Sequence, residues 1–200
     1  MKIYGTRMSR AGRCMWVLEE LGLAYEQVAV NVQMGETRTP EYLALNPSGK
    51  VPVLEDDGFV LRESMAIALY LVSKAATPLW PDDMQTRAKI YQWASWAATE
   101  VEGPLGVIFL ERRRMGEAEL DPEFVAARIT TARNALELLE NYLTSHPYVA
   151  GDNFTLGDLL ACSVMTLVPM FIELAPYPAI CDWMARCTAR PAWARAEAKR

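Results

Sequence analysis

The sequence predicts two domains: a small α/β domain over residues 1–75 and an all-helical domain over residues 85–200, joined by a linker at 76–84. Strand-like and helix-like patterns alternate through the first domain, and only helical patterns follow the linker. The linker contains Pro78 and Pro81 and has no periodic apolar residues.

The composition is that of a globular protein. Hydrophobic residues make up 52% of the 200 residues and charged residues 22%, with a net charge of −5. This acidic balance argues against a nucleic-acid partner. No apolar run is long enough to span a membrane, and residues 1–5 lack the apolar stretch of a signal peptide. The four cysteines fit no zinc spacing, so we expect free thiols in a reducing cytoplasm and no metal site.

The first elements follow a β-α-β order. Residues 2–4 form a short apolar strand candidate that ends at Gly5. Residues 9–21 carry apolar residues at helical spacing, and Gly22 closes that helix. Residues 25–32 alternate as a second strand does, and a crossover of this kind usually makes the two strands parallel.

A hairpin and two further helices complete the first domain. Strands over 51–54 and 59–62 flank Asp57 and Gly58, a strong hairpin signal. The other predicted elements are a short helix over 40–45, an Asn-Pro-Ser-Gly turn over 46–49, and a helix over 65–72 with Ser64 as its N-cap.

The second domain shows only helical patterns. They run over 85–114, 123–144, 155–171 and 178–188, with a short tail helix after Pro191. Thr155 and Asp158 form a variant of the capping box, in which Thr155 bonds forward and Asp158 bonds back. We interpret this motif as structural.

Two short motifs could bind a ligand. Pro52 lies inside a strand pattern, where proline belongs at an edge, and an edge leaves the Val51 backbone free to pair with an extended peptide. A helix that begins at Glu63 and Ser64 offers unpaired backbone donors to a carboxylate, and Glu63 could take an ammonium group. From spacing alone, an ordinary edge proline and a plain N-cap are the favoured interpretations of these residues.

Ser9 could donate a hydrogen bond to an anion from the start of the first helix, and Tyr4 is a rival donor near the end of strand one. Their structural alternatives are an N-cap serine and a packed strand aromatic. The apolar neighbours of Cys14 indicate a buried thiol rather than a nucleophile. His146 is the only histidine and has no matched nucleophile, so we do not expect a catalytic triad.

Taken together, these segments resemble the cytosolic glutathione transferase superfamily over nearly the whole chain. The strongest resemblance lies in residues 46–54 (Asn-Pro-Ser-Gly-Lys-Val-Pro-Val-Leu) and 61–67 (Leu-Arg-Glu-Ser-Met-Ala-Ile). Residues 16–22 are similar to the family's first helix, and residues 154–158 to its capping motif. The resemblance implies a thioredoxin-like domain with a cis-proline at position 52, followed by an all-α domain.

The same resemblance implies glutathione as co-substrate. The cysteinyl backbone of the tripeptide would pair with Val51, next to Pro52, and its γ-glutamyl end would meet Glu63 and Ser64. Lys50 is placed to approach the glycyl carboxylate.

Further residues follow from the resemblance. Arg38 is a weaker candidate for the glycyl carboxylate. Ser9 matches the serine-type members, which are theta-like or bacterial enzymes, whereas an ungapped comparison places Tyr4 near the tyrosine of other classes. We favour Ser9, because the Ser-x-x-x-Arg spacing from Ser9 to Arg13 fits. Cys14 lies too far along the helix to match the cysteine-type members.

The function implied is a glutathione transferase whose thiolate attacks a small hydrophobic electrophile, with dehalogenation or peroxide reduction as related activities. The helical domain would line the electrophile cleft, and the matching region contains Trp93, Trp96, Val107, Phe109, Leu110 and Arg112. A homodimer is expected from the resemblance. The alternatives are a non-catalytic binding or regulatory member of the fold, and a thiol oxidoreductase, which would need a cysteine where Ser9 stands.

Overall fold

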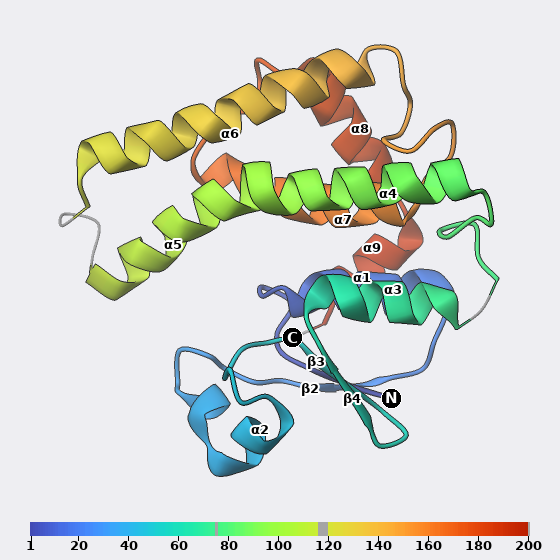
Figure 1. Ribbon diagram of the computed structural model, residues 1–200, viewed down its shortest axis with the longest axis vertical. Coiled ribbons are helices and arrows are strands. Elements are labelled where there is room, and N and C mark those ends of the chain that lie inside the picture. Colours follow the sequence, from blue (N-terminus) through green and yellow to red (C-terminus); the bar gives the residue numbers. More distant parts are fainter. Residues whose placement is uncertain (75, 116–119, 200) are drawn as a thin grey trace. The chain divides into compact units, whose positions relative to one another are not determined.

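The computed structural model describes residues 1–74, 76–115 and 120–199, and the chain divides into two compact units (Figure 1). One unit comprises Met1–Pro81 together with Thr188–Arg200, and the other comprises Asp82–Cys187. Residues 75 and 200, at which the sequence predicts that the two domains end, lie outside the described residues.

The first unit is built on a four-stranded sheet with the order β2-β1-β3-β4. Its strands are β1 (Lys2–Tyr4), β2 (Glu26–Val28), β3 (Val53–Asp56) and β4 (Phe59–Arg62). Strand β1 pairs in parallel with β2 and antiparallel with β3, and β3 and β4 form the predicted hairpin. The mixed sheet confirms the predicted α/β fold of this half of the chain.

Helices cover both faces of this sheet. Helices α1 (Ala11–Leu21) and α3 (Ser64–Ser73) pack together on one face, and η1 (Glu36–Arg38) and α2 (Pro40–Leu45) lie on the other (Figure 1). Tyr42 of α2 packs with the buried Val53 and with Tyr4 of β1. Residues that alternate along each strand therefore contribute to two separate apolar layers.

The last helix, α9 (Pro191–Glu197), belongs to the first unit. The Trp193 ring meets the fully buried Trp16 of α1 edge to face, with 4.6 Å between centroids. Arg190 Nε lies 2.7 Å from Glu20 Oε1. The sequence predicts a helical domain that continues to residue 200, whereas in the structure these contacts join the tail helix to α1.

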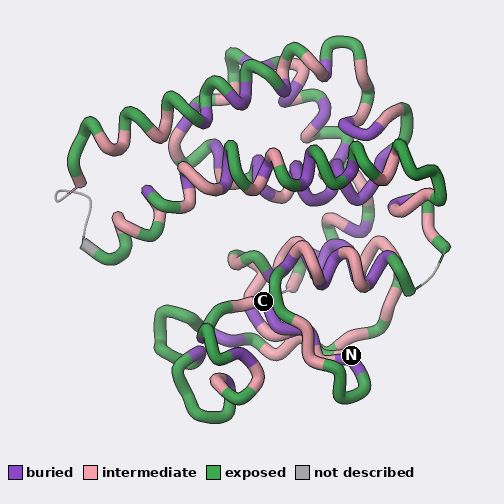
Figure 2. The backbone as a smooth tube through the Cα atoms, in the orientation of Figure 1, coloured by how far each residue is buried: buried purple, intermediate pink, exposed green. Residues whose placement is uncertain are grey.

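The second unit is all-helical, as predicted. Its elements are α4 (Met84–Trp96), the π-helical turn η2 (Ala97–Glu102), α5 (Gly103–Met115), α6 (Pro122–Leu143), α7 (Leu156–Met165), the 3₁₀ turn η4 (Val168–Met170) and α8 (Pro178–Thr188). The π turn lies just before Pro104, which has no N–H to donate and whose ring needs space in the preceding turn. Figure 2 shows exposed residues alternating with intermediate ones in the first half of α6 and with buried ones from Ala132 onward. No helix in the described segments is both long and apolar enough to cross a membrane.

Asp158 is fully buried at the start of α7 and accepts four hydrogen bonds. Its Oδ1 accepts from Val149 N at 2.8 Å and from Trp183 Nε1 at 3.0 Å. Its Oδ2 accepts from the backbone N–H of Thr155 at 2.9 Å and from its hydroxyl at 3.0 Å. Burial raises the pKa of the Asp158 carboxyl despite these donors. The predicted capping box is present, and it also connects to α8.

Candidate functional site

A pocket in the first unit brings together residues from both predicted ligand motifs. It is lined by Arg10, Asn46, Lys50, Val51, Pro52, Glu63 and Ser64. Five of these residues were predicted from the sequence, and Arg10 and Asn46 were not. Arg10 immediately precedes α1, while Glu63 and Ser64 are at the start of α3. The pocket therefore lies where two helix N-termini meet the loop before β3.

The loop before β3 is held in shape by Asn46 and Tyr42, which are both buried. Asn46 Nδ2 and the Tyr42 hydroxyl donate to the Lys50 carbonyl at 2.7 Å and 2.8 Å. Asn46 Oδ1 accepts from the backbone N–H and the hydroxyl of Ser48 at 3.1 Å and 2.8 Å. The Val51–Pro52 peptide bond that follows is cis. Asn46 was missed because the turn signal explained it without a ligand.

We expect Asn46→Ala to lower stability by about 1–3 kcal/mol, because the buried Asn46 side chain loses its hydrogen bonds to Lys50 and Ser48. Glutathione, the ligand that the sequence resemblance implies, should also bind more weakly, since the loop would no longer present Lys50 and Val51 in one conformation. Urea denaturation and calorimetric titration with glutathione would measure both effects. Asn31→Ala is the matched control, because Asn31 makes a similar turn in an exposed loop away from the pocket lining. Equal losses in the two variants would contradict this role for Asn46.

Glu63 and Ser64 combine a strained backbone with an uncapped helix end. Glu63 has φ 70°, a conformation that costs a non-glycine residue about 1–3 kcal/mol and is concentrated at functional sites. Among the described residues, no side chain caps the first turn of α3. Ser64 is buried at the bottom of this turn, with 6% of its surface exposed. The free N–H groups of the turn and the helix dipole together favour an anionic group here.

Ser9 lies in the loop between β1 and α1, outside the residues that line the pocket. Its hydroxyl donates to the Thr6 carbonyl at 2.7 Å and accepts from Ala11 N at 3.2 Å. A Cβ added at Gly5 would lie 3.3 Å from Ser9 Oγ and 3.2 Å from Val51 Cβ, so these two atoms flank the same small space. Gly5 has φ 131°, a backbone conformation that glycine adopts more readily than other residues, and it has no side chain to fill this space.

Tyr4 packs in the apolar layer between the sheet and α2, with Tyr42 and Val53. Its hydroxyl donates to Glu55 Oε2 at 2.9 Å, and its ring lies 6.2 Å from that of Tyr42. Burial, aided by the Glu55 carboxylate, raises the pKa of Tyr4 to about 12. A hydroxyl committed to a carboxylate is a poor donor to a second anion.

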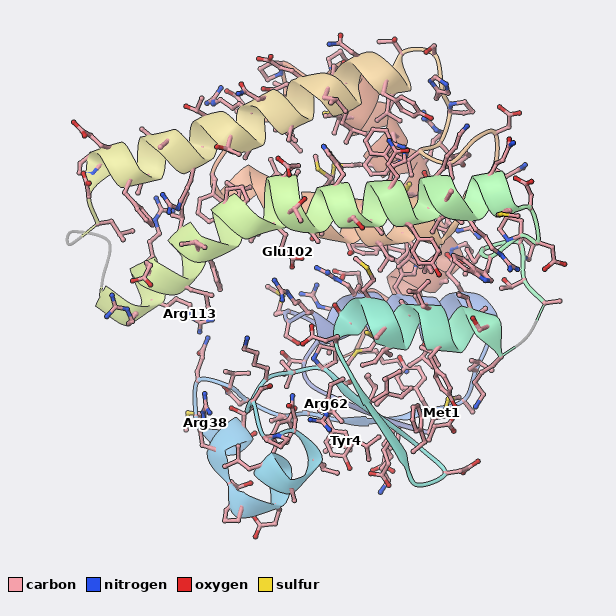
Figure 3. The ribbon with its side chains drawn as sticks, viewed as in Figure 1. Met1, Tyr4, Arg38, Arg62, Glu102 and Arg113 are labelled. Carbon is pink, nitrogen blue, oxygen red and sulfur yellow. The ribbon has the colours of Figure 1, made fainter. Side chains whose placement is uncertain are left out.

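Arg38 projects from the end of η1 beside α2 (Figure 3). Its guanidinium packs against the backbone of Gly49, where an added Cβ would lie only 2.7 Å from Arg38 Nη1. Gly49 directly precedes Lys50, which lines the pocket. Arg38 therefore contacts a neighbour of the pocket lining without lining the pocket itself.

Cys14 is fully buried, as the sequence predicts. Its Sγ lies 3.6 Å from the Ser64 carbonyl oxygen, and burial raises the pKa of the thiol to about 12. The thiol therefore stays protonated, and its place is structural.

The six residues that the sequence predicts for the region of the electrophile cleft all lie in the helical unit, and Trp93, Trp96, Phe109 and Arg112 are the main candidates among them. Trp93 is 3% exposed, and its ring packs against Trp96 and Tyr142 at centroid distances of 5.1 Å and 4.7 Å. Phe109 and Arg112 are on α5, and each makes a cation–π contact within that unit. Their part in binding an electrophile stays a prediction.

Comparison with known proteins covers most of the chain. Residues 1–73 match the family described as "Glutathione S-transferase, N-terminal domain", and residues 106–191 match "Glutathione S-transferase, C-terminal domain". A rice protein named probable glutathione S-transferase GSTF2 is 34% identical, covering 96% of this chain and 93% of its own. Human glutathione S-transferase theta-2 is 30% identical, covering 94% and 81%. A solved glutathione S-transferase-I with bound lactoylglutathione has a TM-score of 0.84 at 30% identity, covering 98% of each chain.

Proposed function

We infer the function from one premise, which is that this chain belongs to the glutathione S-transferase family. It is a glutathione transferase, and glutathione is its co-substrate. One observation in this chain carries the inference: a single pocket is lined by Val51 and Pro52 from one motif and by Glu63 and Ser64 from the other. These are the groups that a γ-glutamyl tripeptide needs, a free extended backbone and a helix end.

In the proposed complex, the cysteinyl backbone of glutathione pairs with Val51. The γ-glutamyl carboxylate accepts from the first turn of α3 and from the Ser64 hydroxyl, and Glu63 takes the α-ammonium group. Lys50 approaches the glycyl carboxylate, with Arg38 behind the Gly49 turn. Arg10 and Lys50 give the lining two cationic side chains against the single carboxylate of Glu63, which suits a ligand with net negative charge.

The chemical task is to hold the sulfur of glutathione as a thiolate. A thiol has an ordinary pKa of about 8.5, and lowering it by two units requires about 2.7 kcal/mol of preference for the anion. A hydrogen bond to a charged group contributes about 1.5–3 kcal/mol and a helix N-terminus about 0.3–1 kcal/mol. One hydroxyl donor at the start of α1 is therefore sufficient. The thiolate then attacks the electrophile.

The proposed donor is Ser9, which makes this a serine-type, theta-like or bacterial-type enzyme. Ser9 Oγ and Val51 Cβ flank the same space, so the hydroxyl is near the backbone that would hold the cysteinyl residue. Rotation about its Cβ–Oγ bond would redirect the hydrogen bond of the hydroxyl from the Thr6 carbonyl to the sulfur, while the proton stays on Oγ. The N–H of Ala11 would continue to polarise the oxygen. The Tyr4 hydroxyl, by contrast, already donates to Glu55.

The second substrate is proposed to be a small hydrophobic electrophile, bound with the help of Trp93, Trp96, Phe109 and Arg112.

We further propose a cytoplasmic homodimer. Phe59 of β4 supports an association surface, because it is 49% exposed and its ring lies 5.3 Å from that of Tyr70. Sedimentation velocity should then give about twice the chain mass of 22.4 kDa, and Phe59→Ser should shift the protein toward the monomer. A monomeric wild-type protein would contradict the proposal.

Capture on immobilised glutathione, followed by a conjugation assay with an aromatic halide, tests the function. We expect specific capture that free glutathione elutes, and turnover that depends on both substrates. A chain that neither binds glutathione nor conjugates it would overturn the proposal. Binding without turnover on a panel of electrophiles would favour a non-catalytic member of the fold.

A further inference from the structure

An ion pair connects the loop that carries Ser9 to the last helix of the chain. Arg7 Nη1 lies 2.8 Å from Glu197 Oε1 and 2.7 Å from Oε2. Both side chains belong to the first unit, and they are 30% and 36% exposed. Glu197 is the last residue of α9 and lies beyond residue 191, where the match to the family's C-terminal domain ends.

The backbone of Arg7 is fixed from its other side by α1. A Cβ added at Gly12 would lie only 2.3 Å from the Arg7 carbonyl oxygen, so the first turn of α1 packs directly against this peptide group. The backbone N–H of Gly12 also donates to the Ser9 carbonyl at 2.9 Å. The loop therefore has little freedom toward α1, and the Arg7 side chain fixes it toward α9.

Ser9 depends on this loop for its orientation. The Thr6 carbonyl accepts both the Ser9 hydroxyl at 2.7 Å and the Ser9 N–H at 3.0 Å. Arg7 is bonded to that carbonyl carbon through its own nitrogen. A displacement of Arg7 therefore displaces the carbonyl whose bond to the Ser9 N–H fixes the backbone of Ser9, and with it the position of its Oγ.

The other ion pairs of α9 are on a different part of α1. Arg195 Nε lies 2.9 Å from Glu19 Oε2, and Arg190 pairs with Glu20. Glu19 and Glu20 are near the C-terminal end of α1, about two turns from the Ser9 loop. These pairs hold α9 in place without contacting the loop, whereas the Arg7–Glu197 pair uses the anchored helix to hold the loop.

We propose that Arg7 and Glu197 are positioning residues for Ser9, an inference that rests on the proposed role of Ser9 as hydrogen-bond donor to the glutathione thiolate. The last turn of α9 thereby takes part in activating glutathione without touching it. Loss of either side chain would free the loop, and the Ser9 hydroxyl would point at the sulfur in a smaller fraction of molecules.

The test compares Arg7→Gln, Glu197→Gln and the double variant with Arg195→Gln, which breaks an ion pair of the same helix away from the loop. The pKa of bound glutathione is measured from the ultraviolet absorbance of its thiolate as a function of pH. We expect each single variant to raise this pKa and to lower kcat about three- to tenfold at neutral pH, with KM for glutathione almost unchanged. At high pH, where the thiol ionises unaided, the variants should approach wild-type turnover.

The double variant should lose no more kcat than the less active of the two single variants, because both substitutions break the same interaction. Arg195→Gln should leave the pKa of the thiol unchanged. The inference is overturned if Arg7→Gln and Glu197→Gln behave as Arg195→Gln does. Measuring Ser9→Ala beside Arg7→Gln separates the two proposals. If Ser9→Ala itself does not raise the pKa of the thiol, the role of Ser9 fails. If Ser9→Ala raises it and Arg7→Gln does not, only the positioning role fails.

Discussion

Replacing Ser9 by alanine is expected to lower kcat by about 100-fold or more, as the loss of a single aligned donor does in other enzymes. The pKa of bound glutathione should rise toward the ordinary thiol value of about 8.5, so turnover at neutral pH suffers most. Glutathione should still bind within about threefold of wild-type affinity, because the groups proposed to hold its two ends lie on other elements. Steady-state kinetics and a titration of the bound thiol measure these two quantities.

Tyr4→Phe is the matched control for this prediction, since it removes the rival hydroxyl. The loss of its bond to Glu55 should cost a little stability and leave kcat within about twofold of wild type. If Ser9→Ala keeps full turnover, or if Tyr4→Phe loses more, the activating hydroxyl belongs to Tyr4 or to another residue.

Asp158→Ala should give the largest loss of stability, about 3–5 kcal/mol, because it leaves buried N–H groups of Val149, Thr155 and Trp183 without an acceptor. That is a large fraction of the 5–15 kcal/mol that stabilises a typical domain. We expect a greatly reduced yield of folded protein and a lower midpoint in urea, measured by circular dichroism.

Two substitutions separate the hydrogen bonds of Asp158 from its size. Asp158→Asn retains one acceptor oxygen but turns an amide toward the Thr155 N–H, so an intermediate loss is expected. Thr155→Ala removes only the hydroxyl donor and should cost about 1 kcal/mol. A loss below about 1 kcal/mol in Asp158→Ala would mean that water or a shifted side chain satisfies these donors.

The elements that the sequence predicts well are those with local signals. The short helix of residues 40–45 and the strand of residues 59–62 have their predicted bounds, because Pro40 begins the first and the Asp57-Gly58 turn precedes the second. Strand β2 is shorter than the predicted span of 25–32. It pairs only with β1, which has three residues, so the ladder ends where its partner ends.

Long-range contacts explain what the sequence did not predict. Arg190 and Glu20 are 170 positions apart, and no local pattern indicates that they pair. Arg10 was missed for the same reason, because its place in the pocket depends on two distant segments. The residues around Pro52 and Glu63 could be grouped only through the family resemblance. Periodicity alone predicts only an edge-strand proline at Pro52 and a helix cap at Ser64.

The place of α9 makes the first unit discontinuous in sequence, with Asp82–Cys187 as an insertion between its two parts. The ribosome synthesises residues 1–81 long before Trp193. More than a hundred further residues must therefore be synthesised before Trp193 can pack against Trp16. Residues 1–81 expressed alone would expose the apolar side of α1 that α9 covers in the whole chain. The core of the first unit therefore needs residues from both sides of Asp82–Cys187, and cutting the chain at the linker would divide that core.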